Sequence, residues 1–284
     1  MKDRGFVLVN ALVLVAAMAV LAVFLMYLSE RAQSRRWAAQ EYAQAVLYLD
    51  GAEALVATRL QRDLQQNSTD TADEDWAKPV INTPIDRGTI SVTVVDLQGR
   101  FNVNWLGNPE DDAIHAVFDR YAESIGLPPT LAQNIAAFVK PGIGYGQIAM
   151  MDELLRVESM TPQRLLRYSE HLTALPADTT LNINAADADL LSAFFPGLSR
   201  TTLDRIMGAE PLVSAEAFVN AVQTALGEDA RDDIDELRFS VGSAWYGAEI
   251  YARLGAVHLR RQSVLLRRPP PTGTTVVHRV TTRD

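Results

Sequence analysis

The side chains that could carry out catalysis are few in this chain and lie far apart in the sequence. There is no cysteine among the 284 residues, so metal sites built on thiolates are excluded. The histidines are too dispersed to suggest a histidine-rich site: His115, His171, His258 and His278. The densest group of carboxylates is typical of a solvated face: Asp232, Asp233, Asp235 and Glu236. No activated nucleophile and no carboxylate pair in an apolar setting is found, and we therefore expect no enzyme.

Two glycine turns could hold a phosphate with their backbone amides. The run from Pro141 to Gly146 has a Gly-x-Gly-x-Gly pattern, but no strand–helix–strand context surrounds it, so this signal is weak. The turn Pro196-Gly197-Leu198 lies between two expected helices and resembles the turn of a helix-hairpin-helix motif. Basic residues usually flank that turn in DNA-binding versions, whereas Arg200 and Arg205 stand here among acidic residues.

The net charge of −9 also disfavours a nucleic-acid partner. We therefore favour a protein-interaction or structural use of this helical unit, with no nucleic acid bound. A membrane-anchored helix-hairpin-helix protein that binds DNA, as in DNA uptake, stays the alternative function.

The third chemical candidate is a peptide bond, the one between Gly5 and Phe6. It separates a short leader, with Lys2 and Arg4 as its basic residues, from an apolar run that ends at Leu28. About 23 apolar residues in a helix are enough to cross a hydrocarbon core of about 30 Å.

Three interpretations of this segment stay open. A secretory signal peptide could be cleaved at Ala17-Met18-Ala19, but the mature chain would then begin with a long apolar stretch. A plain membrane anchor would need no cleavage. The short basic leader and the Gly5–Phe6 junction resemble a type IV pilin-like prepilin, which a dedicated membrane peptidase cuts after the glycine before the new terminal residue, here Phe6, is methylated.

Asn10 departs from the usual prepilin pattern. Most pilin-like subunits carry glutamate at the fifth mature position, which is Asn10 here. A lone carboxylate in lipid costs about 2.5–3.5 kcal/mol, and in a filament it is relieved by the terminal amine of the next subunit. A subunit at the very tip has no neighbour above it, so a neutral residue at this position suits a tip subunit.

Charge counting does not orient the apolar helix in a membrane. Lys2 and Arg4 favour a cytoplasmic leader, whereas Arg31, Arg35 and Arg36 beyond the apolar run favour the reverse. The prepilin resemblance implies processing on the cytoplasmic face, and therefore a leader on the cytoplasmic side.

The elements that follow predict an α+β chain. The first helix should continue to about Gln66, because only Gly51 interrupts it and no proline is present. The polar residues 67–86 are typical of a loop. We expect a hairpin next, in which a strand over 87–94 pairs with a strand over 100–106. Helical patterns then give way to strands from about Arg238.

These elements indicate a pilin-like fold, in which the long N-terminal helix packs on an antiparallel sheet. A large all-α domain of the helix-hairpin-helix or SAM-like type should be inserted into this sheet. The predicted segments are a leader (1–5), a transmembrane part of the helix (6–28), its periplasmic part (29–66), the first part of the sheet domain (67–107), the helical insertion (108–237), and the returning strands with an arginine-rich tail (238–284). The tail arginines protect a sheet edge or dock an acidic partner.

The chain resembles the protein K family of type II secretion system minor pseudopilins. The stretches that carry the resemblance are Gly5-Phe6 with Asn10, Phe101-Asn102-Val103-Asn104, Met151–Val157 and Leu181–Ala186. The resemblance implies a single-pass protein of the Gram-negative inner membrane with its C-terminal domain in the periplasm. It would cap a periplasmic pseudopilus that moves folded exoproteins through an outer-membrane secretin.

The resemblance also implies a set of partners. Minor pseudopilins I and J would share the tip, H would join it, and the major pseudopilin G would form the filament below. Prepilin peptidase, the inner-membrane assembly platform and the secreted exoproteins are the other expected contacts.

A calcium site is not expected. Many members of the family have a Trp-x-Asp-x-Asp segment before the glycine-rich loop, but Phe138–Tyr145 takes that place here. Calcium needs about six to eight oxygen ligands, and Asp152 with Glu153 cannot supply them. We therefore expect no metal and no cofactor.

Overall fold

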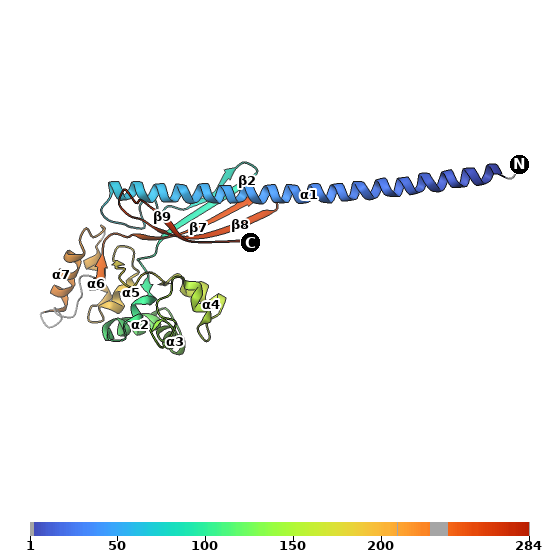
Figure 1. Ribbon diagram of the computed structural model, residues 1–284. Coiled ribbons are helices and arrows are strands. Elements are labelled where there is room, and N and C mark those ends of the chain that lie inside the picture. Colours follow the sequence, from blue (N-terminus) through green and yellow to red (C-terminus); the bar gives the residue numbers. More distant parts are fainter. Residues whose placement is uncertain (1–2, 209, 228–237, 284) are drawn as a thin grey trace.

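The computed structural model describes residues 3–208, 210–227 and 238–283, with side chains from residue 11 onward. Helix α1 (Asp3–Gln66) is its longest element (Figure 1). The first half of α1 projects freely, and the second half lies along a β-sheet. The other helices form a block next to the sheet, at the end away from the N-terminus. The acidic run over 232–236 lies outside the described residues.

The predicted continuation of the helix far beyond the apolar run is confirmed, since α1 ends at Gln66. Its buried positions begin only in the second half and recur every three or four residues: Ala45, Leu49, Ala52, Val56 and Leu60. This spacing places them on one face of the helix. That face packs on the sheet, where Ile250 and Ala252 are fully buried against it.

The sheet has five antiparallel strands in the order β1-β2-β7-β8-β9. They are β1 (Val80–Ile85), β2 (Gly88–Asp96), β7 (Trp245–Leu254), β8 (Val257–Leu266) and β9 (Thr275–Arg283). Strands β2 and β7 are neighbours although the whole helical block lies between them in the sequence. The block is therefore an insertion into the sheet, as the pattern predicted.

The expected pairing of 87–94 with 100–106 is wrong. Strand β2 pairs instead with β1, which lies in the segment predicted to be a loop. Strand β1 is an edge strand, a position at which a proline such as Pro84 is tolerated. The predicted second strand forms only β3 (Phe101–Asn102), which pairs with a segment of the insertion, and the 3₁₀ helix η1 (Val103–Gly107).

The insertion consists of two halves with the same plan. The first half contains β3, η1, α2 (Asp112–Ser124), α3 (Pro129–Val139), the 3₁₀ helix η2 (Met151–Arg156), α4 (Pro162–Tyr168) and β4 (Leu172–Thr173). The second half contains β5 (Leu181–Asn182), α5 (Ala188–Phe194), α6 (Arg200–Met207), α7 (Ala215–Leu226) and β6 (Phe239–Ser240). In each half the opening and closing two-residue strands pair in parallel.

The two halves also match in detail. The turn between the first two α-helices carries Gly126-Leu127 in one half and Gly197-Leu198 in the other. Both halves contribute to one continuous hydrophobic core, which includes Phe118 and Tyr121 of α2 and Phe218 of α7. The insertion is thus a single packed unit attached at one end of the sheet.

Candidate functional site

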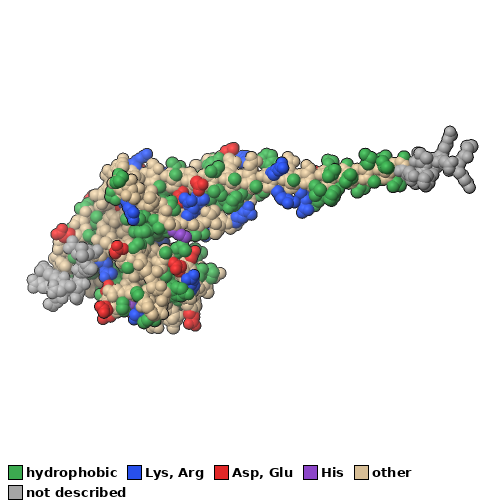
Figure 2. All heavy atoms as spheres, in the orientation of Figure 1, with side chains coloured by type: hydrophobic (Ala, Val, Ile, Leu, Met, Phe, Trp, Pro, Cys, Tyr) green, Lys and Arg blue, Asp and Glu red, His purple; other side chains and the backbone are tan. Residues whose placement is uncertain are grey.

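The free half of α1 exposes an apolar surface to its surroundings. Large side chains stay uncovered along this segment, for example Leu21 at 58% and Phe24 at 54% exposure. The helix is long and apolar enough to cross a membrane, and none of its most apolar stretch is buried against the rest of the chain. Figure 2 shows hydrophobic side chains along this projecting rod. Such a surface requires lipid or other helices around it.

The predicted processing residues lie at the start of this rod. Gly5, Phe6 and Asn10 all fall within the first turns of α1. Their side chains are outside the described part of the structure. Cleavage after Gly5, methylation of Phe6 and the role of a neutral Asn10 therefore stay predictions.

The seated half of α1 is held on the sheet by buried charges as well as by apolar contacts. Glu53 is 2% exposed and lies opposite the last two strands. Its Oε1 accepts a hydrogen bond from Ser263 Oγ at 2.9 Å, and its Oε2 pairs with Arg279 Nη2 at 2.5 Å. One turn earlier, Asp50 Oδ1 pairs at 2.5 Å with Nη1 of the buried Arg261.

A second buried cation, Arg267, binds the C-terminal end of α1 and the loop that follows it. Its Nη1 pairs with Asp63 Oδ2 at 2.9 Å, and its Nη2 pairs with Asp70 and donates to the Ser243 carbonyl at 2.6 Å. The guanidinium also lies 4.8 Å from the ring centroid of Tyr246. Burial raises the pKa of Asp63, so the nearby guanidinium matters for keeping this carboxylate charged.

These contacts give a use to the arginine-rich tail. Arg261, Arg267 and Arg279 bind acids of α1 and of the following loop, and Arg279 does so from the edge strand β9. Removing one partner of a buried ion pair costs about 3–5 kcal/mol. The acids at 50, 53 and 63 and the arginines of the tail are visible in the sequence, but no local pattern shows that they pair.

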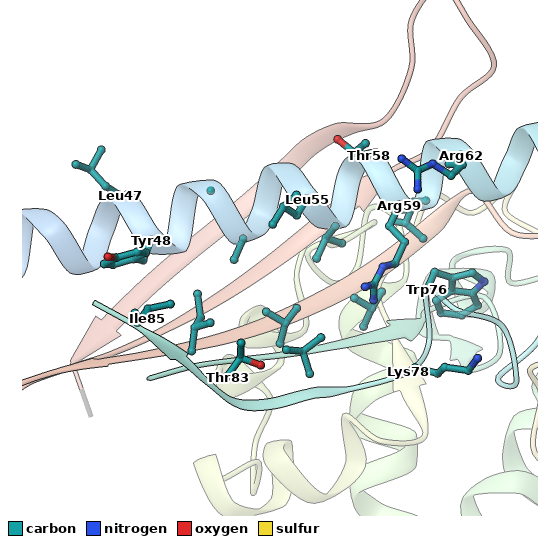
Figure 3. Close-up of a pocket in the computed structure, with 18 residues that line it drawn as sticks. Leu47, Tyr48, Leu55, Thr58, Arg59, Arg62, Trp76, Lys78, Thr83 and Ile85 are labelled. Atoms are coloured by element: carbon teal, nitrogen blue, oxygen red, sulfur yellow. The ribbon is translucent and has the colours of Figure 1, made fainter. Parts of the chain in front are cut away.

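A groove runs beside the seated half of α1. The helix packs mainly on β7 and β8, which leaves the adjoining face of β1 and β2 open. The groove has a volume of about 530 Å³, and Figure 3 shows Tyr48 and Leu55 of α1 facing it with Ile85 of β1. Leu55 is 71% exposed, and a Cβ at Gly51 would meet nothing within 4 Å. A second helix or strand could therefore approach α1 closely here.

The groove has a basic end. Arg59 and Arg62 of α1 and Lys78 of the following loop line it there (Figure 3). The Arg59 guanidinium donates to the Asp75 carbonyl at 3.3 Å, and Lys78 Nζ pairs with the Asp75 carboxylate at 2.5 Å. The groove is therefore apolar along most of its length, and its basic end is partly neutralised by Asp75.

The insertion joins the sheet through a polar seam. Asn182 Nδ2 donates to Asp96 Oδ2 at 2.8 Å, to the Asp70 carbonyl at 3.0 Å and to Ser243 Oγ at 3.0 Å. Ser243 Oγ in turn donates to Asp96 Oδ2 at 2.6 Å. Burial raises the pKa of Asp96 to about 6, although these hydrogen bonds favour its charged form. One carboxylate thus links the end of β2, the insertion and the start of β7.

Paired asparagines shape both halves of the insertion. Asn104 Oδ1 accepts from the Ile148 amide at 2.9 Å, and Asn184 Oδ1 accepts from the Leu212 amide at the same distance. The repeated apolar-Asn-apolar-Asn pattern at 101–104 and 181–184 was the available sequence signal for this twofold plan. These side-chain amides, buried at Asn104 and partly buried at Asn184, fix the fold because each bonds backbone groups that would otherwise be unpaired.

No family model matches the chain. It is 30% identical over 233 residues to type II secretion system protein K of Klebsiella pneumoniae, a match that covers 69% of this chain and 71% of the relative. The chain belongs to the type II secretion system protein K family. Protein K of Pectobacterium carotovorum subsp. carotovorum is 24% identical, with 93% of this chain and 92% of the relative covered. Protein K of Pseudomonas aeruginosa is 27% identical, with 86% and 83% covered.

The fold agrees with this assignment to the protein K family. A chain in the crystal structure of the GspK-GspI-GspJ complex from enterotoxigenic Escherichia coli superposes with a TM-score of 0.69. The match covers 88% of this chain and 100% of that chain at 21% identity. The predicted pilin-like fold, with a long N-terminal helix on an antiparallel sheet, is confirmed.

Two acidic groups of this protein K family member could be considered for a metal. In η2, Glu153 is engaged, because its Oε1 accepts from the Ala149 amide at 2.8 Å and the Met150 amide at 3.1 Å. Among the described residues, Asp63, Asp70 and Glu74 bring carboxylate oxygens within 4.8 Å of one another. Arg267 already pairs with Asp63 and Asp70, so a cation of the chain itself takes part in this cluster.

At the first glycine turn backbone amides bond within the chain, and at the second an adjacent arginine is paired with acids. In the turn after α3, the Gly144 amide donates to the Lys140 carbonyl at 2.9 Å, and the Tyr145 amide donates to the Phe138 carbonyl at 2.7 Å. Beside the α5–α6 turn, Arg200 pairs with Asp189 at 2.7 Å and with Asp204 at 3.4 Å. The cation best placed to meet a phosphate there is therefore already neutralised, which disfavours the DNA-binding alternative.

Proposed function

We propose that this chain is a minor pseudopilin of the type II secretion system that caps the tip of the periplasmic pseudopilus. Its role is structural and not catalytic, and it supports export of folded proteins through the outer membrane. The observation that carries this proposal is the division of α1 into an uncovered apolar half and a half locked on the protein's own sheet. A filament subunit needs both, because one half must pass from lipid into the filament while the other carries the periplasmic domain.

The N-terminal residues have defined tasks in this proposal. Prepilin peptidase cleaves after Gly5, and Phe6 becomes the methylated terminus. Residues 6–28 hold the subunit in the inner membrane, with the C-terminal domain in the periplasm, until the assembly platform extracts it. A neutral Asn10 removes the need for an amine from a subunit above, as expected at a tip.

The groove beside α1 is the surface we assign to a neighbouring minor pseudopilin. The relative whose fold matches was crystallised in a GspK-GspI-GspJ complex. A neighbour of the I or J type could lay an apolar helix against Tyr48, Gly51 and Leu55, with its acidic residues near the basic end of the groove. Subunits H and G would join below this complex.

The test is co-purification of the full chain from membranes with minor pseudopilins I and J. We expect Leu55→Asp to reduce recovery of the complex at least about tenfold, because a buried unpaired carboxylate costs several kcal/mol at an interface. Leu166→Asp is the matched control, since Leu166 is a similarly exposed leucine, at 62%, on α4. Undiminished recovery with Leu55→Asp would contradict the groove assignment, and failure of the unmodified chain to recover either partner would contradict the proposed function.

A further inference from the structure

A basic stretch of α1 lies between the apolar segment and the sheet domain. Residues 29–40 are all exposed, and the packing on the sheet begins only near Ala45. Arg31, Arg35 and Arg36 fall in this stretch, within about 12 Å of the end of the apolar run at Leu28. Figure 2 shows Lys or Arg side chains gathered on this part of the rod, next to the hydrophobic surface.

Glu30 is the only acid in this stretch, so three arginines leave it with a positive net charge. Within the part of the chain that the structure describes, none of the three forms an ion pair. Arg31 instead lies 5.3 Å from the ring centroid of Tyr27. Arg31 and Arg35 are one turn apart, where like charges repel. An external anion would relieve this repulsion.

Two aromatic residues flank the arginines. Tyr27 and Trp37 are both 52% exposed, although large aromatic side chains gain much from burial. Tyrosine and tryptophan are enriched where a helix meets the headgroup layer of a membrane. We call the following five residues the headgroup collar: Tyr27, Arg31, Arg35, Arg36 and Trp37.

We propose that the headgroup collar binds the phosphates of anionic phospholipids where α1 leaves the membrane. This inference rests on the proposed function for the membrane insertion of residues 6–28. The three cations are all arginine, whose planar guanidinium forms paired hydrogen bonds to phosphate and is weakly hydrated. Their position opposes the usual charge bias for a cytoplasmic leader, and binding to the outer leaflet gives a reason for them to be there.

The collar would set the depth at which the subunit waits in the membrane. Lipid phosphates would hold the helix with the sheet domain at a fixed height until assembly draws α1 outward. The arginines would then leave the headgroups together, because they span little more than one helical turn. Anionic lipid would thus retain the unassembled subunit.

The test uses the full chain reconstituted in vesicles of phosphatidylcholine with a minor fraction of phosphatidylglycerol. Electron paramagnetic resonance of spin-labelled lipids gives the relative affinity of the protein for each headgroup. We expect a preference for phosphatidylglycerol of about fivefold or more, because a basic residue at an anionic surface contributes about that factor. The variant Arg31→Gln/Arg35→Gln/Arg36→Gln should show almost none, whereas the control Arg59→Gln/Arg62→Gln on the same helix should keep it.

Several results would overturn the inference. Equal affinity of the unmodified chain for the two lipids, or a preference retained by the triple variant, would exclude the headgroup collar. Loss of co-purification with I and J in the triple variant, without lipid preference in the unmodified chain, would assign the arginines to a protein partner instead. A chain that assembled with I and J but showed no lipid preference would leave the proposed function intact, while failure to insert into vesicles would contradict both.

Discussion

The two halves of α1 have the same secondary structure but opposite surroundings. From Ala11 to Glu41 almost every side chain is exposed, whereas from Ala45 to Leu60 one face is buried and carries the buried Glu53. In the part of the chain that the structure describes, the second half contacts apolar strands, arginines of the tail and Ser263, whereas residues 11–40 are exposed throughout. The folded domain therefore covers only the second half of α1, and the first half needs a membrane or partner subunits to cover its apolar surface.

The largest expected effect on stability comes from removing the buried ion pairs that hold α1 on the sheet. Arg267→Ala should lower the free energy of unfolding by about 3–5 kcal/mol, because Asp63 and Asp70 would stay buried without their cation. Urea unfolding of the full chain in detergent, followed by tryptophan fluorescence, measures this change. The matched change in the free half, Arg35→Ala, should stay within about 0.5 kcal/mol. Equal effects of the two changes would contradict the division of α1.

A smaller effect is expected at the seam, and it depends on pH. Asp96 binds its proton more tightly in the folded state, because its pKa is raised from 3.8 to about 6. This group therefore favours the folded state below about pH 4, and stability falls by up to about 3 kcal/mol as the pH rises to about 6, then levels off. Asp96→Asn should remove most of this fall in urea unfolding between pH 4 and 7. Burial also raises the pKa values of Asp63 and Glu74, so a residual slope of the same sign should remain.

The smallest expected effect is that of calcium. We expect no shift of the melting temperature of the unmodified chain, because Arg267 already pairs with Asp63 and Asp70 and too few oxygens remain for a calcium shell. A ligand present at about 100 times its dissociation constant would stabilise the fold by about 2.7 kcal/mol. Stabilisation by calcium but not by sodium at equal ionic strength would contradict this expectation. Asp70 Oδ1, buried without a hydrogen-bond partner, would then be the first candidate ligand.

Much of the fold could be predicted from local patterns. The long helix follows from an apolar run and a proline-free continuation, and the helices after Asp111 and Ser199 begin at the side-chain caps that the sequence offers. Strand β1 was predicted to be a loop, because its polar and proline-containing sequence is compatible with a strand only at a sheet edge. Phe101–Asn102 was misplaced because its asparagine bonds the carbonyl groups of Leu175 and Pro176 in the insertion, far along the chain.

Some features of the candidate site could be predicted from the sequence, and others depend on the fold. The predicted processing junction and the apolar segment of α1 can be read from the sequence, because each is a continuous stretch. The ion pairs between α1 and the tail join residues far apart in the sequence, such as Glu53 and Arg279, and only the folded sheet brings these together. The groove exists because α1 leaves the adjoining face of β1 and β2 uncovered, and no local sequence pattern indicates this arrangement.

The most direct test of the central claim is the N-terminal sequence and mass of the protein isolated from membranes, with and without prepilin peptidase. The account predicts a chain that begins at methylated Phe6 only when the peptidase is present. An intact Met1 terminus in both cases would contradict it and leave a plain anchored protein. A start at Val20 would contradict it as well and would indicate an ordinary secretory signal.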